Sequence, residues 1–343
     1  MRQLFAISLL FIAAAFAQRH PAVSLTPDDA LKLEESLTAN PDDRGARTAL
    51  ISYYFRASAQ SMSPWQYRDV RRGHILWLVQ HFPEDPLAGS PESFIFAQVD
   101  PPGYAQLAAA WDQAVSAKDP SAASLANAGR FFSSSEPEKA SGLLERSLAK
   151  DPKSLSVAMS LAHSYTFQAQ RTKDAAAAAA LRNKAYRRLE AFIELDAQPG
   201  MRQPLVVVIA KAAYDAGEYA KAEQYGAELL KLAAEQPNQW STGNSIHQGN
   251  LVLGRVALHH GDVEKAKRFL LDAGKTPGSP QLNSFGPNMA LARDLLAAKQ
   301  PETVTQYLDL CGVFWKQDRG KLEAWKAEIR QDKIPDFGAN LVF

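Results

Sequence analysis

Two short stretches, GEYAKA at residues 217–222 and GDVEKA at residues 261–266, repeat one pattern. Each begins with a glycine that can end a helix in the left-handed conformation, and an acidic residue follows at the start of the next helix. The alanine at the sixth position keeps the side chain small where two paired helices cross closely. SEPEKA at residues 135–140 occupies the same kind of turn. These stretches predict a chain of helical hairpins.

The rest of the sequence has the periodicity of amphipathic helices. Beyond about residue 25, apolar residues recur at i, i+3, i+4 and i+7. The β-branched run at residues 205–209 continues into an alanine-rich stretch and is predicted to be helical. Pro27, Pro137, Pro287 and Pro301 each open a predicted helix, where the missing N–H is tolerated. The predicted helices lie at residues 27–38, 43–58, 64–82, 102–118, 121–133, 137–150, 154–169, 176–196, 204–216, 219–235, 245–260, 263–273, 287–298, 301–316 and 319–331. The predicted fold class is all-α.

The composition predicts a folded protein and argues against several classes of function. The chain has 343 residues, of which 46% are hydrophobic, enough for a large buried core. The 38 Lys and Arg residues balance 37 Asp and Glu residues, which argues against a nucleic-acid partner. The single cysteine, Cys311, excludes an internal disulfide and any multi-cysteine metal site, and its apolar surroundings predict a buried thiol.

The first residues are typical of a secretory signal peptide. Arg2 precedes an apolar run at residues 4–14, and Ala15-Phe16-Ala17 has the small-x-small pattern of a cleavage site. We expect cleavage after Ala17, which would leave Gln18 as the first residue of a periplasmic or secreted protein. The alternative is an uncleaved anchor, but the apolar run is shorter than a bilayer requires. No later segment reaches that length, so we expect no transmembrane span after cleavage.

Spacing relates the hairpins to a known family. Ala128 and Ala162 fall at equivalent points of successive hairpins, 34 residues apart. On these residues the chain resembles the tetratricopeptide repeat (TPR) family, over residues 121–274 and less clearly over residues 25–118. The resemblance implies a right-handed superhelix, or α-solenoid, of TPR-like hairpins. Some other array of helical hairpins is the alternative.

The best-matching repeat starts near His247. Leu253 and Gly254 match the pair of its first helix, Ala266 matches the small residue at the crossing, and Ala273 matches the small residue of the second helix. The family's first-helix tryptophan is missing throughout. Insertions at residues 175–180 and 237–243 make the array irregular.

The predicted organisation has four parts. They are a signal peptide at residues 1–17, degenerate hairpins at 18–118, TPR-like repeats at 119–274, and a loop with C-terminal capping helices at 275–343. Within the last part, GKTPGSP at 274–280, NSFGPNM at 283–289 and PDFGANL at 335–341 are similar to the tail of exported bacterial TPR proteins of uncharacterised role. That resemblance implies no activity. Trp315 and Trp325 are predicted to cap the open end of the array.

The candidate catalytic and metal-binding motifs in the sequence are incomplete. Gly274-Lys275-Thr276 has the end of a phosphate-binding loop, but Phe269 stands where that motif needs a glycine. His74 and His81 share a helix face but lie about two turns apart, too far to bind one metal ion. We therefore expect no enzyme activity, no cofactor and no metal.

A binding face remains. In TPR proteins the concave groove, lined mainly by first helices, holds segments of partner proteins. Carrying that face onto this chain nominates a group of aromatic, cationic and polar residues suited to an acidic-aromatic segment of another protein. They are Met159, His163, Phe167, Lys211, Tyr214, Gln248, Arg255 and His259. The alternative is that these are ordinary surface or inter-repeat residues.

Two further functions stay open. One is an envelope enzyme with a site near the loop at 274–286, although that loop is also expected to be a structural clasp with Phe285 in the core. The other is a groove for a glycan or peptide, which requires exposed aromatic residues on one strip. The tryptophans that would have to lie there are Trp65, Trp77, Trp111 and Trp240.

Overall fold

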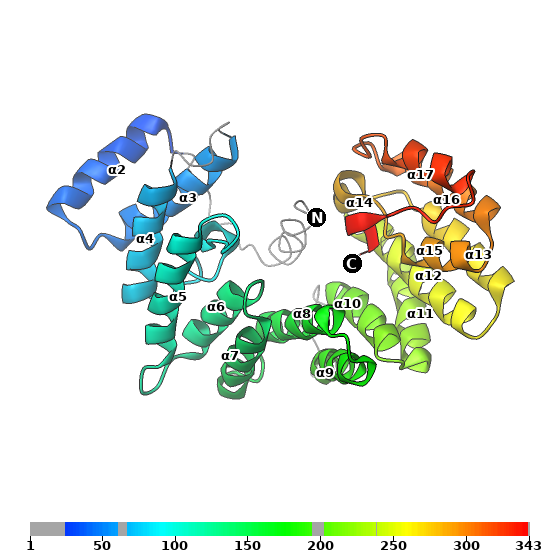
Figure 1. Ribbon diagram of the computed structural model, residues 1–343, viewed down its shortest axis with the longest axis horizontal. Coiled ribbons are helices and arrows are strands. Elements are labelled where there is room, and N and C mark those ends of the chain that lie inside the picture. The colour runs from blue at the N-terminus through cyan, green and yellow to red at the C-terminus, as the bar shows by residue number, and fades with distance from the viewer. Residues whose placement is uncertain (1–24, 61–66, 194–201, 238, 342–343) are drawn as a thin grey trace. The chain divides into compact units, whose positions relative to one another are not determined.

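The computed structural model describes residues 25–60, 67–193, 202–237 and 239–341. Within these ranges the regular elements are 16 α-helices and two short 3-10 helices, with no strand (Figure 1). The prediction of an all-α chain is confirmed. None of the helices in the described ranges combines the length and the apolar character needed to cross a membrane. The expected signal peptide and Trp65 lie outside the described residues.

The described residues form two compact units, 25–173 and 174–341, and the division falls within the stretch predicted to hold the repeats. The first unit contains α2 (Pro27–Ala39), α3 (Arg44–Gln60), α4 (Arg68–His81), η1 (Pro91–Ser93), α5 (Pro101–Val115), α6 (Ala122–Phe132), α7 (Pro137–Lys150) and α8 (Leu155–Arg171). The second contains α9 (Ala175–Ile193), α10 (Arg202–Asp215), α11 (Tyr219–Glu235), α12 (Thr242–His259), α13 (Val263–Gly274), α14 (Pro280–Phe285), α15 (Ala290–Ala297), α16 (Pro301–Phe314), α17 (Lys321–Ile329) and η2 (Gly338–Leu341).

The two repeated turns adopt the same backbone conformation. Gly217 and Gly261 both have φ of 82°, the left-handed value that favours glycine. After each glycine, the next N–H bonds back to the carbonyl five residues earlier: Glu218 to Ala213 at 2.9 Å, and Asp262 to Ala257 at 2.9 Å. These bonds satisfy carbonyls that the end of a helix leaves free. The predicted helix ends after α10 and α12 are confirmed.

One predicted helix start is wrong. The sequence placed a helix start at Pro287, whereas α15 begins at Ala290. The N-cap is Met289, and the side chain of Asn288 before it accepts a hydrogen bond from the Ala290 N–H at 2.8 Å, so the helix starts after the proline. The short helix α14 was not predicted, because its six residues are too few to show a helical period.

The first unit is built from helices that pack against their neighbours in the chain. Trp111 and Phe132 are completely buried in its larger core cluster. Asn127 of α6 donates hydrogen bonds to the carbonyls of Pro83 and Asp85 at 2.9 and 2.8 Å. These bonds satisfy two carbonyl groups of the loop after α4 and hold that loop against α6.

Helix α12 is the centre of the second unit. It contacts α10, α11, α13, α14 and α15 (Figure 1). Two glycines permit close approaches to α11 and α15. A Cβ atom on Gly249 would lie 3.0 Å from the carbonyl oxygen of Gly226 in α11, and one on Gly254 would lie 2.3 Å from Leu291 Cδ2 in α15. Both positions therefore exclude a larger residue without rearrangement.

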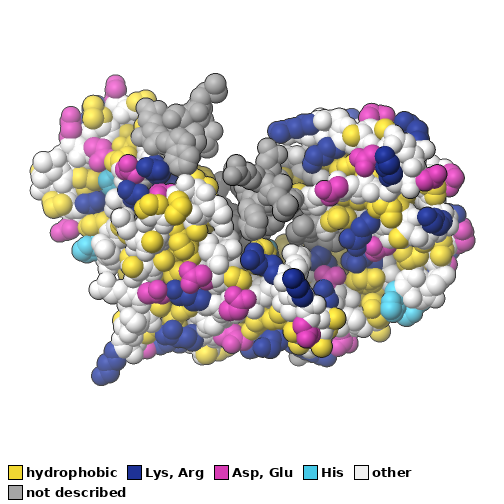
Figure 2. All heavy atoms as spheres, in the orientation of Figure 1, with side chains coloured by type: hydrophobic (Ala, Val, Ile, Leu, Met, Phe, Trp, Pro, Cys, Tyr) yellow, Lys and Arg dark blue, Asp and Glu magenta, His cyan; other side chains and the backbone are white. Residues whose placement is uncertain are grey.

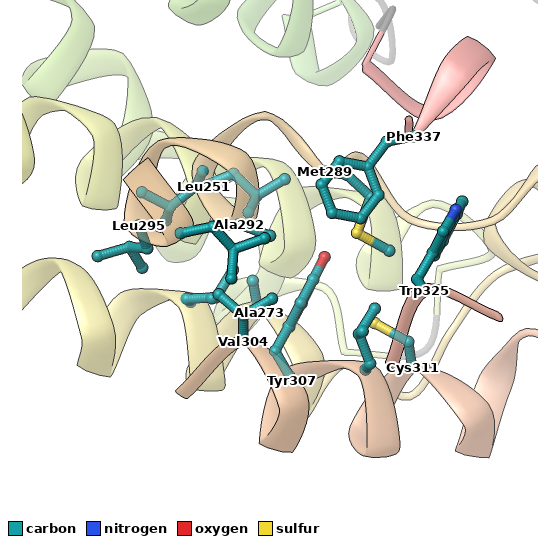
Figure 3. Packing of buried hydrophobic residues seen from close by; sticks show 14 of the residues in the cluster. Leu251, Ala273, Met289, Ala292, Leu295, Val304, Tyr307, Cys311, Trp325 and Phe337 are labelled. Carbon is teal, nitrogen blue, oxygen red and sulfur yellow. The ribbon is translucent and has the colours of Figure 1, made fainter. Parts of the chain in front are cut away.

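The C-terminal helices close one hydrophobic cluster with α12 and α13. Its members include Tyr307, Cys311 and Trp325, which are joined by Met289 and by Phe337 from the last described segment (Figure 3). Cys311 has no exposed surface, and burial raises the pKa of its thiol. The prediction of a buried cysteine is confirmed.

The close approach at Gly254 can be tested by adding a methyl group. We expect Gly254→Ala to lower the free energy of unfolding of this unit by about 1–3 kcal/mol, because the buried side chain of Leu291 must shift and Phe269 Cβ lies only 3.1 Å from the added atom. The measurement is the rate of Cys311 thiol labelling against urea, since a single buried cysteine reports opening of this unit.

Gly312→Ala is the matched control. Its added Cβ would meet only Leu322 Cδ1, at an ordinary 3.7 Å, so the gain in helix propensity should leave stability unchanged or higher by up to about 1 kcal/mol. Equal stability of the two variants would contradict this account of the packing.

Candidate functional site

The guanidinium of Arg255 joins three helices of the second unit. Its Nη1 lies 3.6 Å from Asp215 Oδ1 of α10, and its Nε lies 3.4 Å from Asp294 Oδ2 of α15. Its Cζ lies 4.0 Å from the ring centroid of Tyr214. Only 14% of the Arg255 side chain is exposed, so these charges interact in a partly dehydrated setting and hold the side chain in place.

Further ion pairs lie on both sides of Arg255. Lys211 Nζ donates to Asp215 Oδ2 at 3.0 Å, and Arg293 Nη2 donates to Asp294 Oδ1 at 3.0 Å. Cations and carboxylates therefore alternate across α10, α12 and α15. We call the surface made by these helices and by Tyr219, the first residue of α11, the α12 face. Its residues are Lys211, Tyr214, Asp215, Tyr219, Arg255, His259 and Asp294.

Stacked rings occupy the end of the α12 face near the two glycine turns. The imidazole of His259 lies 3.7 Å from the ring of Tyr219 in a stacked arrangement, and Tyr219 meets Tyr214 edge-on at 5.4 Å. Burial raises the pKa of the Tyr214 phenol, and the positive charge of Arg255 opposes that shift. The phenol stays neutral at physiological pH. The rings thus form one row from His259 to the guanidinium of Arg255.

The structure brings together four of the nominated residues: Lys211, Tyr214, Arg255 and His259. Gln248 lies on the same helix, half-buried, and its Oε1 atom is buried with no hydrogen-bond partner among the described residues. The remaining members of the α12 face were not predicted from the sequence. Asp215 follows Lys211 by four residues, a spacing that signals an ion pair on one helix face. The pairing of Asp294 with Arg255 joins residues far apart in the chain and gives no such signal.

The other three nominated residues lie on α8, in the first unit. Met159 is only 8% exposed and packs in the interior, so it does not line a surface. His163 and Phe167 are partly exposed, and the guanidinium of Arg171 lies 5.3 Å from the ring centroid of Phe167.

The histidine pair of α4 has separate structural roles. His74 is buried between α2 and α3: its Nε2 lies 2.9 Å from Glu34 Oε1, and its Nδ1 lies 3.3 Å from Arg47 Nη1. Because a guanidinium can only donate, Nδ1 accepts and Nε2–H donates to the carboxylate. His81 is exposed and stacks on Trp77 at 4.8 Å. The described residues contain no group of three or more metal-ligating side chains.

The segment at 274–286 is tied to α12 by hydrogen bonds. Thr276 Oγ1 donates to the Gly243 carbonyl at 2.8 Å, and Ser279 Oγ donates to Asn244 Oδ1 at 2.8 Å. Leu282 is its buried hydrophobic side chain, whereas Phe285 is 41% exposed. The expectation that Phe285 fills the core is therefore wrong, because α14 turns Leu282 inward instead.

The last described residues bind this segment through hydrogen bonds, and we call residues 274–289 and 335–341 together the clasp. The side-chain amide of Asn340 donates to the carbonyls of Phe285 and Pro287 at 3.1 and 3.0 Å, and the Asn340 carbonyl accepts from the Met289 N–H at 2.8 Å. Phe337 is buried beside Trp325. The polar groups of the clasp thus largely form hydrogen bonds with one another.

A fully buried histidine holds the clasp to α12. His247 Nδ1 bonds to the Ala273 carbonyl at 3.2 Å, and its Nε2 accepts from the Asn288 N–H at 3.2 Å. These partners require a neutral ring with its proton on Nδ1. Burial lowers the pKa of His247 from its ordinary value of 6.5 to about 4. His247, the group with this lowered pKa, has no exposed surface, and its role is structural.

Among the described tryptophans, Trp111 is excluded from the exposed strip that a glycan groove needs. Trp111 is completely buried in the core of the first unit, which removes it from any surface. Trp77 is partly exposed in that unit, and Trp240 is 68% exposed in the second.

Comparisons of the chain with models of protein families, with curated proteins and with solved structures gave no match. The function is therefore inferred from the residues and contacts themselves.

The buried His247 predicts loss of stability in acid. Its pKa in the folded state, about 4, lies below the unfolded value, so the unfolded chain binds the extra proton. Stability from this group is fully present above about pH 6.5. It is lost as the pH falls from about 6.5 to about 4, by about 3 kcal/mol in total.

The measurement is urea unfolding across that pH range, read from labelling of Cys311 by a disulfide reagent active in acid. We expect His247→Gln to remove this part of the pH dependence, while His260→Gln, at an exposed position, keeps it. A wild-type slope that survives in His247→Gln would contradict the assignment.

Proposed function

We propose that this chain is an exported helical-repeat protein of the tetratricopeptide type, and that it binds a segment of another protein on the α12 face. The observation that carries the proposal is the position of Arg255. It ion-pairs with α10 and α15 and covers the ring of Tyr214 while its surroundings stay partly open to solvent.

The arrangement of hairpins supports a repeat architecture in the second unit. The pairs α10–α11 and α12–α13 are joined by turns of equal backbone conformation, and their crossing residues Ala222 and Ala266 have no exposed surface. Helix α12 contacts both α10 and α15, so the first helices of successive hairpins lie against one another. This is the neighbour-to-neighbour stacking expected of a solenoid.

The residue types of the α12 face favour protein binding. Tyrosine and arginine are enriched among the residues that contribute most to protein–protein affinity. Here the rings and the guanidinium hold one another in place, so little side-chain entropy is lost when a partner binds. Apolar, cationic and acidic groups are interspersed over the surface that Figure 2 shows, without a large field of one sign.

The ion pairs of the α12 face favour one kind of partner segment over another. Lys211 and Arg255 already face carboxylates, so a strongly acidic segment gains less from them than unpaired cations would offer. The exposed ring of His259 and the edge of Tyr219 offer a contact for an aromatic or aliphatic side chain. We infer an extended segment that packs an apolar side chain on these rings and uses mixed charges to set its register.

This function can be tested with peptides selected from a random library for binding to the wild-type protein. We expect Tyr214→Ala and Arg255→Met each to weaken binding by about 10-fold or more, because each removes part of the row of rings and charge. Fluorescence anisotropy of labelled peptides gives the dissociation constants.

Two variants control this experiment. Tyr214→Phe keeps the ring and should retain binding within about threefold. Lys231→Met removes a cation that is 75% exposed on α11, away from the face, and should change nothing. Selected peptides that bind Tyr214→Ala as tightly as wild type, or no selectable peptide at all, would contradict the proposal.

Export makes a separate prediction. We expect the protein recovered outside the cytoplasm of a bacterial host to begin at Gln18, as measured by the mass of its N-terminal peptide. Ala17→Arg should block this cleavage, while Phe16→Leu, at the tolerant middle position, should not. An exported chain that begins at Met1 would contradict the cleavage site.

A further inference from the structure

Arg130 is a half-buried cation in the first unit. It lies in the last turn of α6, and its guanidinium reaches α8. Its Nη2 donates to Ser156 Oγ at 3.3 Å and its Nε to Ser160 Oγ at 3.4 Å, while Nη1 donates to Asn127 Oδ1 at 3.1 Å. All three partners are neutral.

No carboxylate of the described residues pairs with Arg130. Two other partly buried guanidinium groups do have such partners: Arg72 lies 3.1 Å from Asp100, and Arg255 faces two carboxylates. A third, that of Arg71, donates to backbone carbonyls. Removing a positive charge from water without a counter-charge is unfavourable. In agreement, burial lowers the pKa of Arg130. The charge of this group is therefore only weakly compensated within the unit.

One edge of the guanidinium is left for a ligand. The Nη1 bond is fixed, because Asn127 is itself held by the carbonyls of Pro83 and Asp85. The other edge, Nε and Nη2, has only the two serine hydroxyls, at distances near the upper limit of a hydrogen bond. The Ser156 hydroxyl can rotate to donate to a ligand, whereas the Ser160 hydroxyl donates to the Ser156 carbonyl at 2.9 Å and must turn away from it to do so. The edge then presents two N–H donors flanked by two O–H donors.

We propose that this edge of Arg130, with the hydroxyls of Ser156 and Ser160, is a binding site for a phosphoryl group. A guanidinium edge matches two oxygens of such a group in parallel, and a tetrahedral oxyanion has further oxygens for the hydroxyls, which a carboxylate lacks. His163 follows Ser160 by three residues and so lies on the same side of α8. The site belongs to the first unit and does not depend on the α12 face.

The test is direct titration of the whole protein with inorganic phosphate by isothermal calorimetry, in chloride buffer at constant ionic strength. We expect saturable binding with one site per chain. Arg130→Gln should weaken it by about 10-fold or more, and the double variant Ser156→Ala, Ser160→Ala by about 3-fold or more. O-Phosphoserine is titrated in parallel. Tighter binding of the ester or of the free ion supports the site and identifies its source.

Two controls keep the test decisive. Arg187→Gln removes a guanidinium that is largely exposed and paired with Glu190, and it should leave phosphate affinity unchanged. Arg130→Lys keeps the charge but loses the parallel donors. It should fold even where Arg130→Gln does not, and it should bind at least about 5-fold more weakly than wild type. Phosphate affinity equal in wild type and Arg130→Lys, or no saturable binding up to about 50 mM, would overturn the proposal.

Discussion

The second unit depends on the close approach of α12 to its neighbours. Gly249 brings its backbone against α11, and Gly254 lets the side chain of Leu291 from α15 pack against it. Arg255 follows Gly254 directly, so its guanidinium emerges where α15 and α10 are both within reach. The same closeness lets His247, two turns earlier, bond to the Ala273 carbonyl and the Asn288 N–H at once. A larger residue at either glycine would separate the helices that build the α12 face and the clasp.

Two half-buried arginines illustrate different uses of charge. Arg255 is neutralised by Asp215 and Asp294, and its fixed guanidinium covers Tyr214, which suits a surface that recognises a partner by shape and aromatic packing. Arg130 is surrounded by neutral oxygens and keeps an unbalanced charge. A buried charge without a counter-charge makes an interior less stable, and that energy is recovered when an anion binds. The two sites therefore suggest different ligands for the two units.

Local signals made most of the fold predictable. The turns at Gly217 and Gly261 and the helical periods were read correctly, because caps and amphipathic spacing act within a few residues. Expectations that needed tertiary contacts fared worse. Phe285 was predicted to lie in the core but is exposed, and Met159 was predicted from the repeat register to lie on a surface but is buried. The pairs of Arg255 with Asp294 and of Arg130 with α8 join distant residues, and nothing in the sequence marks them.

The central claim is that the α12 face binds a segment of another protein. Hydrogen–deuterium exchange of the full chain, with and without a selected peptide at saturation, tests it most directly. The account predicts that added protection falls on α10, on α12 around Arg255 and on α15, while α16 and α17 exchange as before. Protection confined to α16 and α17, or to the first unit, would contradict it.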